Sequence, residues 1–288
     1  MTPAGRLYVV ATPIGNLGDV TARAREVLGR VAAVAAEDTR HTGHLLAALG
    51  ISRPLVSLHE HNERERVPAL VARMQAGEDI AIVSDAGTPL VSDPGFHLVR
   101  AAAWAGIEVL AVPGACALVA ALSVAGLPTD RFCFEGFLPA RASARRSRLA
   151  ELAQETRTMV FYEAPQRLAD FLADAAVACG AARRAVVARE LTKLHERVYH
   201  GTLAELALRA LEDTDLRRGE IVVVVAGAEK TGQQDGTEPG RVLRILLKSL
   251  SPSRAAALTA EITGASRNDC YQLALQIGRE AGAETPLE

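Results

Sequence analysis

The regular alternation of short apolar runs with helical stretches restricts the first 125 residues to few folds. In the helical stretches, such as 62–75 and 95–105, apolar residues recur at helical spacing. Gly106 marks the end of the second stretch. Strands separated by crossover helices pair in parallel, so residues 1–126 are predicted to form an α/β domain around a parallel sheet. The predicted strands are Leu7–Ala11, Val31–Ala36, Leu55–Leu58, Ile80–Val83 and Ile107–Val112.

Residues 127–228 are predicted to form a second α/β domain. The segment between residues 188 and 197 is too short for a crossover helix, so at least one antiparallel pair is expected and the sheet should be mixed. The predicted strands are 132–135, 158–162, 185–188, 197–200 and 221–226, and the predicted helices are 143–154 and 166–178.

Residues 229–240 are polar and rich in glycine, which is typical of a linker. Residues 241–288 are predicted to form a helical extension, with helices at 242–250, 253–262 and 267–279. A glycine-containing turn at 263–265 has the length found in helix-turn-helix motifs. Residues 241–279 carry six Lys or Arg against two Asp or Glu, so this segment is locally basic.

Composition excludes several classes of protein. The protein has 32 Lys and Arg against 34 Asp and Glu, so it does not hold a partner through a large excess of positive charge of its own. Because 49% of its residues are hydrophobic, a disordered chain is also excluded. The uncharged segment 109–127 is nearly long enough to span a bilayer, but Pro113-Gly114 divides it into a buried strand and a buried helix. With no export segment and four widely spaced cysteines, a cytoplasmic protein with reduced thiols and no membrane partner is expected.

The ends of the predicted strands are where an α/β sheet binds ligands. The first strand is followed by no G-x-G-x-x-G turn, which argues against a nicotinamide or flavin dehydrogenase. Prolines follow several strands, at Pro13, Pro89, Pro113 and Pro165. Because proline fixes the backbone and an adjacent glycine lets a ligand approach it closely, these ends could form a pocket wall; alternatively, the prolines only terminate the strands.

Five motifs then occur in order, and together they resemble one family. They are 7–17 (LYVVATPIGNL), 37–40 (EDTR), 84–95 with its SDAGTP and SDPG turns, 161–165 (FYEAP) and 189–193 (RELTK). This set is similar to the RsmI family, the ribosomal RNA small subunit methyltransferase I enzymes of the tetrapyrrole-methylase superfamily. The resemblance covers about residues 6–228, and the trailing helices are similar to the family's helix-turn-helix extension.

The resemblance implies the two-domain tetrapyrrole-methylase fold, with S-adenosylmethionine bound in the cleft, and a homodimer. The implied reaction is 2′-O-methylation of a cytidine ribose in the decoding region of 16S rRNA, within the assembled small subunit. Thr88 stands where many relatives have aspartate, so a charged contact from that position is in doubt. By match to the superfamily motifs, the cofactor-binding residues are Pro13, Ile14, Gly87, Thr88, Pro89, Val91, Gly114, Ala115, Tyr162, Leu191 and Glu220.

A ribose hydroxyl is a poor nucleophile, so a group that accepts its proton would accelerate methyl transfer. We favour Glu163 for this role, because it lies at a proline-fixed strand end, and place His59 second. Each could instead be a hydrogen-bonded structural residue. The other candidates at strand ends are Glu37, Asp38, His61 and Asp85, with Lys193 as an electrostatic partner.

Basic residues are the candidates for contacts to RNA phosphates. They are Arg40, Arg141, Arg145, Arg189 and Lys193, together with the basic tail helices. The arginine run could instead be a solvated helix face, and the tail could serve dimer packing.

No metal site is predicted. The pairs His41/His44 and His59/His61 have neither a cysteine nor an H-E-x-x-H partner. Two rival functions remain open: a tetrapyrrole or other small-molecule methylase on the same fold, and a non-enzymatic nucleic-acid-binding protein that senses S-adenosylmethionine.

Overall fold

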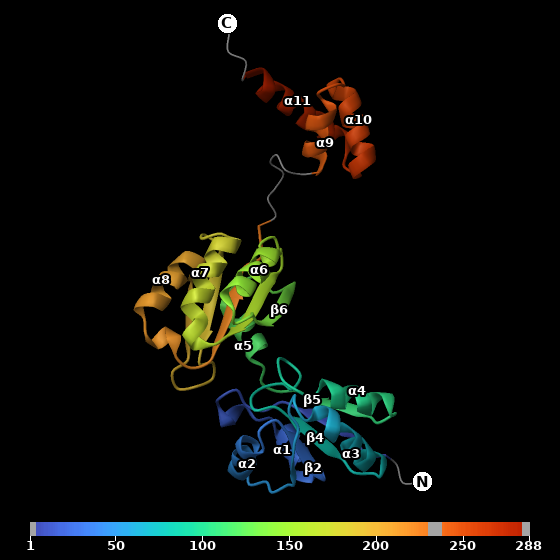
Figure 1. Cartoon of the computed structure of the whole chain (residues 1–288), viewed down its shortest axis with the longest axis vertical. Coiled ribbons are helices and arrows are strands. Elements are labelled where there is room, and N and C mark those ends of the chain that lie inside the picture. Colours follow the sequence, from blue (N-terminus) through green and yellow to red (C-terminus); the bar gives the residue numbers. More distant parts are fainter. Residues whose placement is uncertain (1–3, 230–237, 284–288) are drawn as a thin grey trace. The chain divides into compact units, whose positions relative to one another are not determined.

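The computed structural model describes residues 4–229 and 238–283, and the chain divides into two compact units, Met1–Ala228 and Glu229–Glu288 (Figure 1). The larger unit contains two five-stranded sheets. The predicted domain boundary at 126/127 falls inside this unit, directly after a helix, and it stays a prediction.

The first sheet has the strand order β3-β2-β4-β1-β5, and every pair is parallel, as predicted. Its crossovers place α1 and α2 against one apolar cluster of the sheet and α3 and α4 against another. The elements are β1 (Leu7–Val10), α1 (Ala22–Arg30), β2 (Ala33–Ala36), α2 (Thr39–Ala48), β3 (Leu55–Ser57), α3 (Glu63–Gln75), β4 (Ile80–Val83), α4 (Phe96–Trp104) and β5 (Val109–Val112).

The second sheet is mixed, as predicted, with the order β6-β7-β10-β8-β9. Strands β6 and β7 are parallel, whereas β7/β10, β10/β8 and β8/β9 are antiparallel. The strands are β6 (Phe132–Phe137), β7 (Thr158–Glu163), β8 (Arg184–Arg189), β9 (Arg197–Thr202) and β10 (Ile221–Val225).

Helices cover both faces of the second sheet. On one face α6 (Ala142–Leu152), α7 (Leu168–Cys179) and α8 (Leu203–Glu212) enclose the largest apolar cluster (Figure 1), and α5 (Ala117–Ala125) packs on the other face. The sequence analysis did not anticipate α8. A capping box of Thr202 and Glu205, followed by apolar residues at helical spacing, is the signal that could have found it.

The uncharged segment 109–127 forms β5 and α5, divided at Pro113-Gly114 as expected. Within residues 4–229 and 238–283, no helix has the length and apolar character that crossing a bilayer requires.

Over residues 238–283, the smaller unit contains three helices, α9 (Glu238–Leu246), α10 (Pro252–Thr263) and α11 (Arg267–Ala283). They pack around Leu243, Ala255, Ala256, Cys270 and Ala274. Gly264 ends α10 in the left-handed conformation, with φ of 71°, which suits the predicted turn. Helix α9 begins within the predicted linker 229–240, of which residues 230–237 lie outside the described residues.

Candidate functional site

A cavity of about 470 Å³ lies in the larger unit, at the carboxyl ends of β1, β2 and β4. Residues in and beside the strands of the second sheet, together with the start of α5, complete its wall. Its lining residues are Ile14, Glu37, Asp85, Ala86, Gly87, Thr88, Val91, Ser92, Asp93, Cys116, Ala117, Phe137, Tyr162, Glu163, Ala164, Pro165, Ala188, Leu191, Gly219, Glu220, Ile221 and Val222.

Three carboxylates line the part of the cavity formed by the first sheet. Glu37 follows β2, and Asp85 and Asp93 lie in the segment after β4. None of the three forms an ion pair with any residue in the described ranges. Burial, with the neighbouring Asp85 charge, raises the pKa values of the Glu37 and Asp93 carboxyls. The cavity therefore presents uncompensated negative charge, which favours a cationic ligand.

The segment after β4 adopts an unusual backbone conformation. Thr12 and Gly87 form an antiparallel bridge that ties the ends of β1 and β4 together. Gly87 has φ of 86°, and Leu90 and Ser92 also have positive φ, at 73° and 67°. Such conformations cost a non-glycine residue free energy and are found at functional sites. The strain marks this segment as a shaped wall of the cavity.

Thr88 forms an internal contact within the cavity wall. Its hydroxyl donates to the main-chain oxygen of Ala115 at 3.0 Å. It therefore links the segment after β4 to the turn before α5.

Tyr162 fixes the start of α5 from the second sheet. Its hydroxyl oxygen accepts a hydrogen bond from the backbone N–H of Leu118 at 3.2 Å, and the Phe134 and Phe137 rings contact its ring edge to face. Burial raises the pKa of Tyr162 to about 12, so the phenol remains neutral. Its contacts hold it in the cavity wall.

Glu163, the favoured proton acceptor, lines the cavity at the end of β7, but its side chain is 0% exposed. Its carboxylate accepts from the Ala164 N–H at 2.7 Å and pairs with Arg167 Nε at 3.0 Å. Burial raises the pKa of Glu163 despite these contacts. A raised pKa favours proton acceptance, whereas the ion pair favours a structural role, so the assignment stays a prediction.

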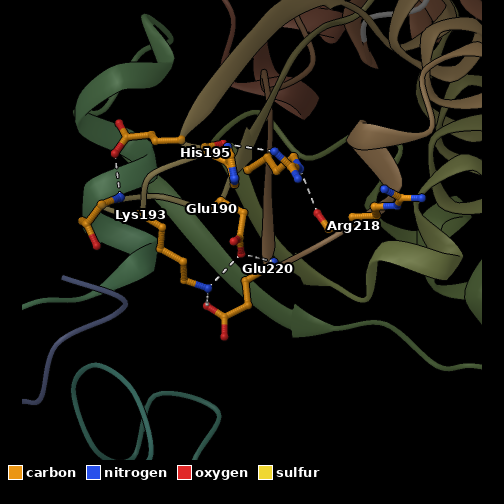
Figure 2. A network of polar contacts seen from close by, with 8 residues as sticks. Glu190, Lys193, His195, Arg218 and Glu220 are labelled. Carbon is orange, nitrogen blue, oxygen red and sulfur yellow. Dashed lines mark hydrogen bonds and ion pairs between the residues drawn. The ribbon is translucent and has the colours of Figure 1, made fainter. Parts of the chain in front are cut away.

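A polar network joins the ends of β8 and β10 at the cavity wall (Figure 2). Lys193 Nζ lies 2.8 Å from Glu190 Oε1 and 3.0 Å from Glu220 Oε2. The Arg189 guanidinium donates to the main-chain oxygens of Arg218 and His195, at 2.8 and 3.0 Å. The network thereby holds the two segments that supply Leu191 and Glu220 to the cavity.

Of the predicted cofactor residues, seven line the cavity: Ile14, Gly87, Thr88, Val91, Tyr162, Leu191 and Glu220. Pro13, Pro89, Gly114 and Ala115 do not line it, although the last contacts Thr88. Among the four strand-end prolines, Pro165 alone lines the cavity. Three of the four prolines therefore lie outside the lining, which favours the alternative that they terminate the strands.

Three of the predicted RNA contacts have internal partners, which argues against their binding a phosphate. Arg145 is 5% exposed and pairs with Asp174 at 2.8 Å, and Arg189 is buried. Lys193 is neutralised by Glu190 and Glu220. A run of like charges in the sequence does not show which members find an acidic partner after folding.

The other two predicted RNA contacts are exposed. Arg141 is exposed at the start of α6. The Arg40 side chain is 87% exposed and pairs with Asp38 at 3.1 Å. Both remain available to a phosphate.

His59 lies outside the cavity lining, in the turn before α3, so its predicted catalytic role is not supported by its position. Its backbone N–H donates to the Asn62 side chain at 2.9 Å, and its ring contacts that of His61. Across the described part of the chain, no group of three or more His, Cys, Asp or Glu is arranged to hold a metal ion.

The sequence analysis missed several lining residues, among them Asp93, Cys116, Phe137 and Gly219. Asp93 belongs to the 92–95 turn, which the motif comparison had already singled out, so the signal was present. Phe137 carried no such signal, because β6 contributes it only through the parallel pairing with β7.

Comparison with known proteins shows two matching families. The model of the Tetrapyrrole (Corrin/Porphyrin) Methylases matches residues 6–207, and that of the RsmI C-terminal HTH domain matches residues 233–278. A ribosomal RNA small subunit methyltransferase I from Pseudomonas aeruginosa is 57% identical, covering 95% of this chain and 98% of its own. Its counterpart from Escherichia coli O157:H7 is 49% identical, covering 94% of this chain and 95% of its own.

Solved structures with the same fold are more distant in sequence. The methyltransferase CobJ has a TM-score of 0.59 at 20% identity, covering 78% of this chain and 95% of its own. The uroporphyrin-III C-methyltransferase of Thermus thermophilus, complexed with S-adenosyl homocysteine, has a TM-score of 0.53 at 21% identity, covering 77% and 97%. These likenesses confirm the fold class.

Proposed function

Because the chain belongs to the ribosomal RNA small subunit methyltransferase I family of tetrapyrrole methylases, we propose that it methylates 16S rRNA of the small ribosomal subunit. The similarity to relatives of that name, over nearly the whole length of both chains, carries this proposal. It covers the helical extension as well as the cavity-bearing unit, which favours the RNA reaction over that of a tetrapyrrole methylase.

S-adenosylmethionine is the methyl donor of this family. The lining of the cavity fits that molecule, because it combines apolar side chains for an adenosine moiety with carboxylates for positive charge. We propose that Ile14, Val91 and Leu191 contact the apolar part. Glu37, Asp85 and Asp93 would then compensate the charged part, and the 470 Å³ cavity is in the range of small-molecule sites.

When bound, S-adenosylmethionine supplies a methyl group on a positively charged sulfur. The residues of the cavity must hold an acceptor oxygen in line with that group and take up the proton of the acceptor hydroxyl. We propose Glu163 for this proton, since its carboxylate lines the cavity and burial raises its pKa. Arg167 would orient the carboxylate through the ion pair at 3.0 Å.

We further propose that the acceptor is the 2′-hydroxyl of a cytidine in the decoding region, within the assembled subunit, and that the enzyme is a cytoplasmic homodimer. The family resemblance supports these finer assignments. Arg40 and Arg141 are exposed and would contact phosphates, as would the basic residues of the helical extension.

The test is methyl transfer from tritiated S-adenosylmethionine to small subunits purified from cells that lack this protein. Label in 16S rRNA, mapped by nuclease digestion and mass spectrometry to a 2′-O-methylated cytidine, is the expected result. Label at another atom or base would overturn the finer assignment alone. Donor binding without transfer to any RNA would favour the SAM-sensing alternative. Light scattering during size-exclusion chromatography tests the homodimer.

A further inference from the structure

Lys193 connects the two sheets of the larger unit, in a position that the proposed reaction does not use. It lies in the turn between β8 and β9, which brings Leu191 into the cavity wall. Glu190 and Thr192 in this turn have positive φ, at 51° and 67°, although neither is glycine. A turn with two such residues must be held by its surroundings, because each conformation costs free energy in isolation.

The charged end of Lys193 is fixed to the second sheet. Its ammonium lies between Glu190, at 2.8 Å, and Glu220, at 3.0 Å (Figure 2). The same Glu190 oxygen accepts the backbone N–H of Glu220 at 2.8 Å. Gly219, with φ of 80°, makes room for this arrangement, since a Cβ there would lie 2.6 Å from Glu190 Cγ. The ammonium is therefore tied to the segment that opens β10.

The methylene chain of Lys193 lies against the turn that follows β1 of the first sheet. Gly15, in the turn after β1, has no side chain at the point where the lysine passes. A Cβ on Gly15 would lie 2.7 Å from Lys193 Cε and 2.9 Å from Cδ. The residue before it, Ile14, is buried in one apolar cluster with Leu191 and lines the cavity.

We propose that Lys193 is a positioning residue for donor binding, which seats the Gly15 turn against the second sheet and so holds Ile14 and Leu191 in one wall of the cavity. Burial lowers the pKa of its ammonium, but the hydrogen bonds to Glu190 and Glu220 outweigh this effect and the net pKa is raised. The lysine remains charged and cannot accept a proton at neutral pH. Its contribution is the preformed shape of the wall, which lowers the cost of ordering the site when the donor binds.

The inference rests on the proposed function only in taking the cavity as the donor site. Calorimetric titration of the full-length protein with S-adenosylmethionine, without RNA, measures the donor affinity that Lys193 is proposed to support. Lys193→Ala removes both the stem and the charge, and we expect donor affinity about tenfold weaker with kcat within about threefold of wild type. Lys193→Met keeps an unbranched stem without the charge and should recover part of the affinity.

Gly15→Ala changes the other residue of this contact, in the turn after β1. The added methyl group meets the lysine stem, and the φ of 143° at Gly15 strains alanine independently, so this variant should also bind the donor more weakly. In the double variant with Lys193→Ala that collision is absent, and the combined loss of affinity should be smaller than the product of the two single losses. Lys248→Ala, an exposed lysine in the other unit, serves as the control for donor affinity.

Melting temperatures measured with and without donor show whether each variant is folded. If Lys193→Ala does not fold, Lys193→Met and Gly15→Ala are used to test the inference. Wild-type affinity in the lysine variants would overturn the inference and leave the proposed function intact. A fall in kcat at unchanged affinity would also overturn it, by assigning Lys193 to the chemical step. Absence of donor binding by the wild-type protein would instead overturn the proposed function.

Discussion

The Asp85 carboxylate accepts a hydrogen bond from the backbone N–H of Asp38 at 3.0 Å. This contact ties the end of β4 to the start of α2, where Asp38 itself caps the helix by accepting from the N–H of Arg40 at 2.8 Å. Because Asp85 also lines the cavity, one carboxylate both orders the strand ends and contributes negative charge to the site.

Two substitutions separate these roles of Asp85. Asp85→Asn keeps an oxygen that can accept from Asp38 but removes the charge, whereas Asp85→Ala removes both. We expect both variants to bind S-adenosylmethionine about tenfold more weakly, and only the alanine variant to lose about 1 kcal/mol of unfolding free energy. Calorimetry and denaturant unfolding measure the two effects. Equal donor affinity in Asp85→Asn and wild type would contradict a charge contribution.

Donor affinity should increase with pH in the acid range. Burial and the neighbouring Asp85 charge raise the pKa values of the Glu37 and Asp93 carboxyls, so below those values the groups are protonated and cannot compensate a cation. A cationic ligand favours the ionised forms, so affinity rises as pH passes upward through the raised pKa values and levels off above them, and binding releases protons.

Titrations between about pH 4.5 and 7, in buffers of different ionisation enthalpy, measure affinity and proton release together. Combining Glu37→Gln with Asp93→Asn should flatten the profile. A profile that keeps its slope in this double variant would show that other groups cause it.

Glu163→Gln tests the proposed proton acceptor. The amide retains the shape of the carboxylate but cannot accept the proton, so kcat for methyl transfer should fall about 10²- to 10⁴-fold while donor affinity stays within about threefold. Single-turnover transfer of tritium to small subunits measures the rate. A normal rate in Glu163→Gln would assign this carboxylate to the ion pair with Arg167 alone, and Glu37→Gln would then be the next variant to assay.

The buried pair of Arg145 and Asp174 should contribute to stability rather than to RNA binding. Arg145→Met leaves the carboxylate of Asp174, which is 16% exposed, without its partner at 2.8 Å, and we expect a loss of about 3 kcal/mol of unfolding free energy. Arg146 also pairs with Asp174, at 3.9 Å, but its side chain is 59% exposed, so Arg146→Met should cost less than about 0.5 kcal/mol. Denaturant unfolding compares them, and equal losses would show that burial of the pair is not the cause.

Glu63 caps a helix that lies 33 residues further along the chain. Its buried carboxylate accepts the backbone N–H groups of His97 and Leu98 at the start of α4, at 2.8 and 3.2 Å. Glu63→Ala should cost about 2 kcal/mol of unfolding free energy, because the first turn of α4 loses its acceptor. The matched control is Glu65→Ala, because Glu65 lies in α3 like Glu63 but is exposed. Hydrogen exchange at His97 should accelerate in the first variant and stay unchanged in the second.

Hydrophobic periodicity was sufficient to predict the parallel first sheet, the mixed second sheet and the three helices of the extension. It reports on local backbone conformation, so predicted strand ends differ from the observed ones by a few residues, as at Val109, two residues after the predicted start. Helix α8 was missed although its capping box is itself a local signal. The ordered motifs were sufficient to identify the family.

The partners of charged side chains were decided only by the tertiary structure. Arg145 meets an aspartate 29 residues away, and Lys193 meets Glu220, which precedes β10, and Gly15, in the turn after β1. Because the pairing of a charge depends on which distant segments fold together, no local pattern could separate these lysine and arginine residues from Arg141, which remains exposed. Sequence determined which elements form and which family they belong to, and long-range packing determined which of the polar residues face the cavity.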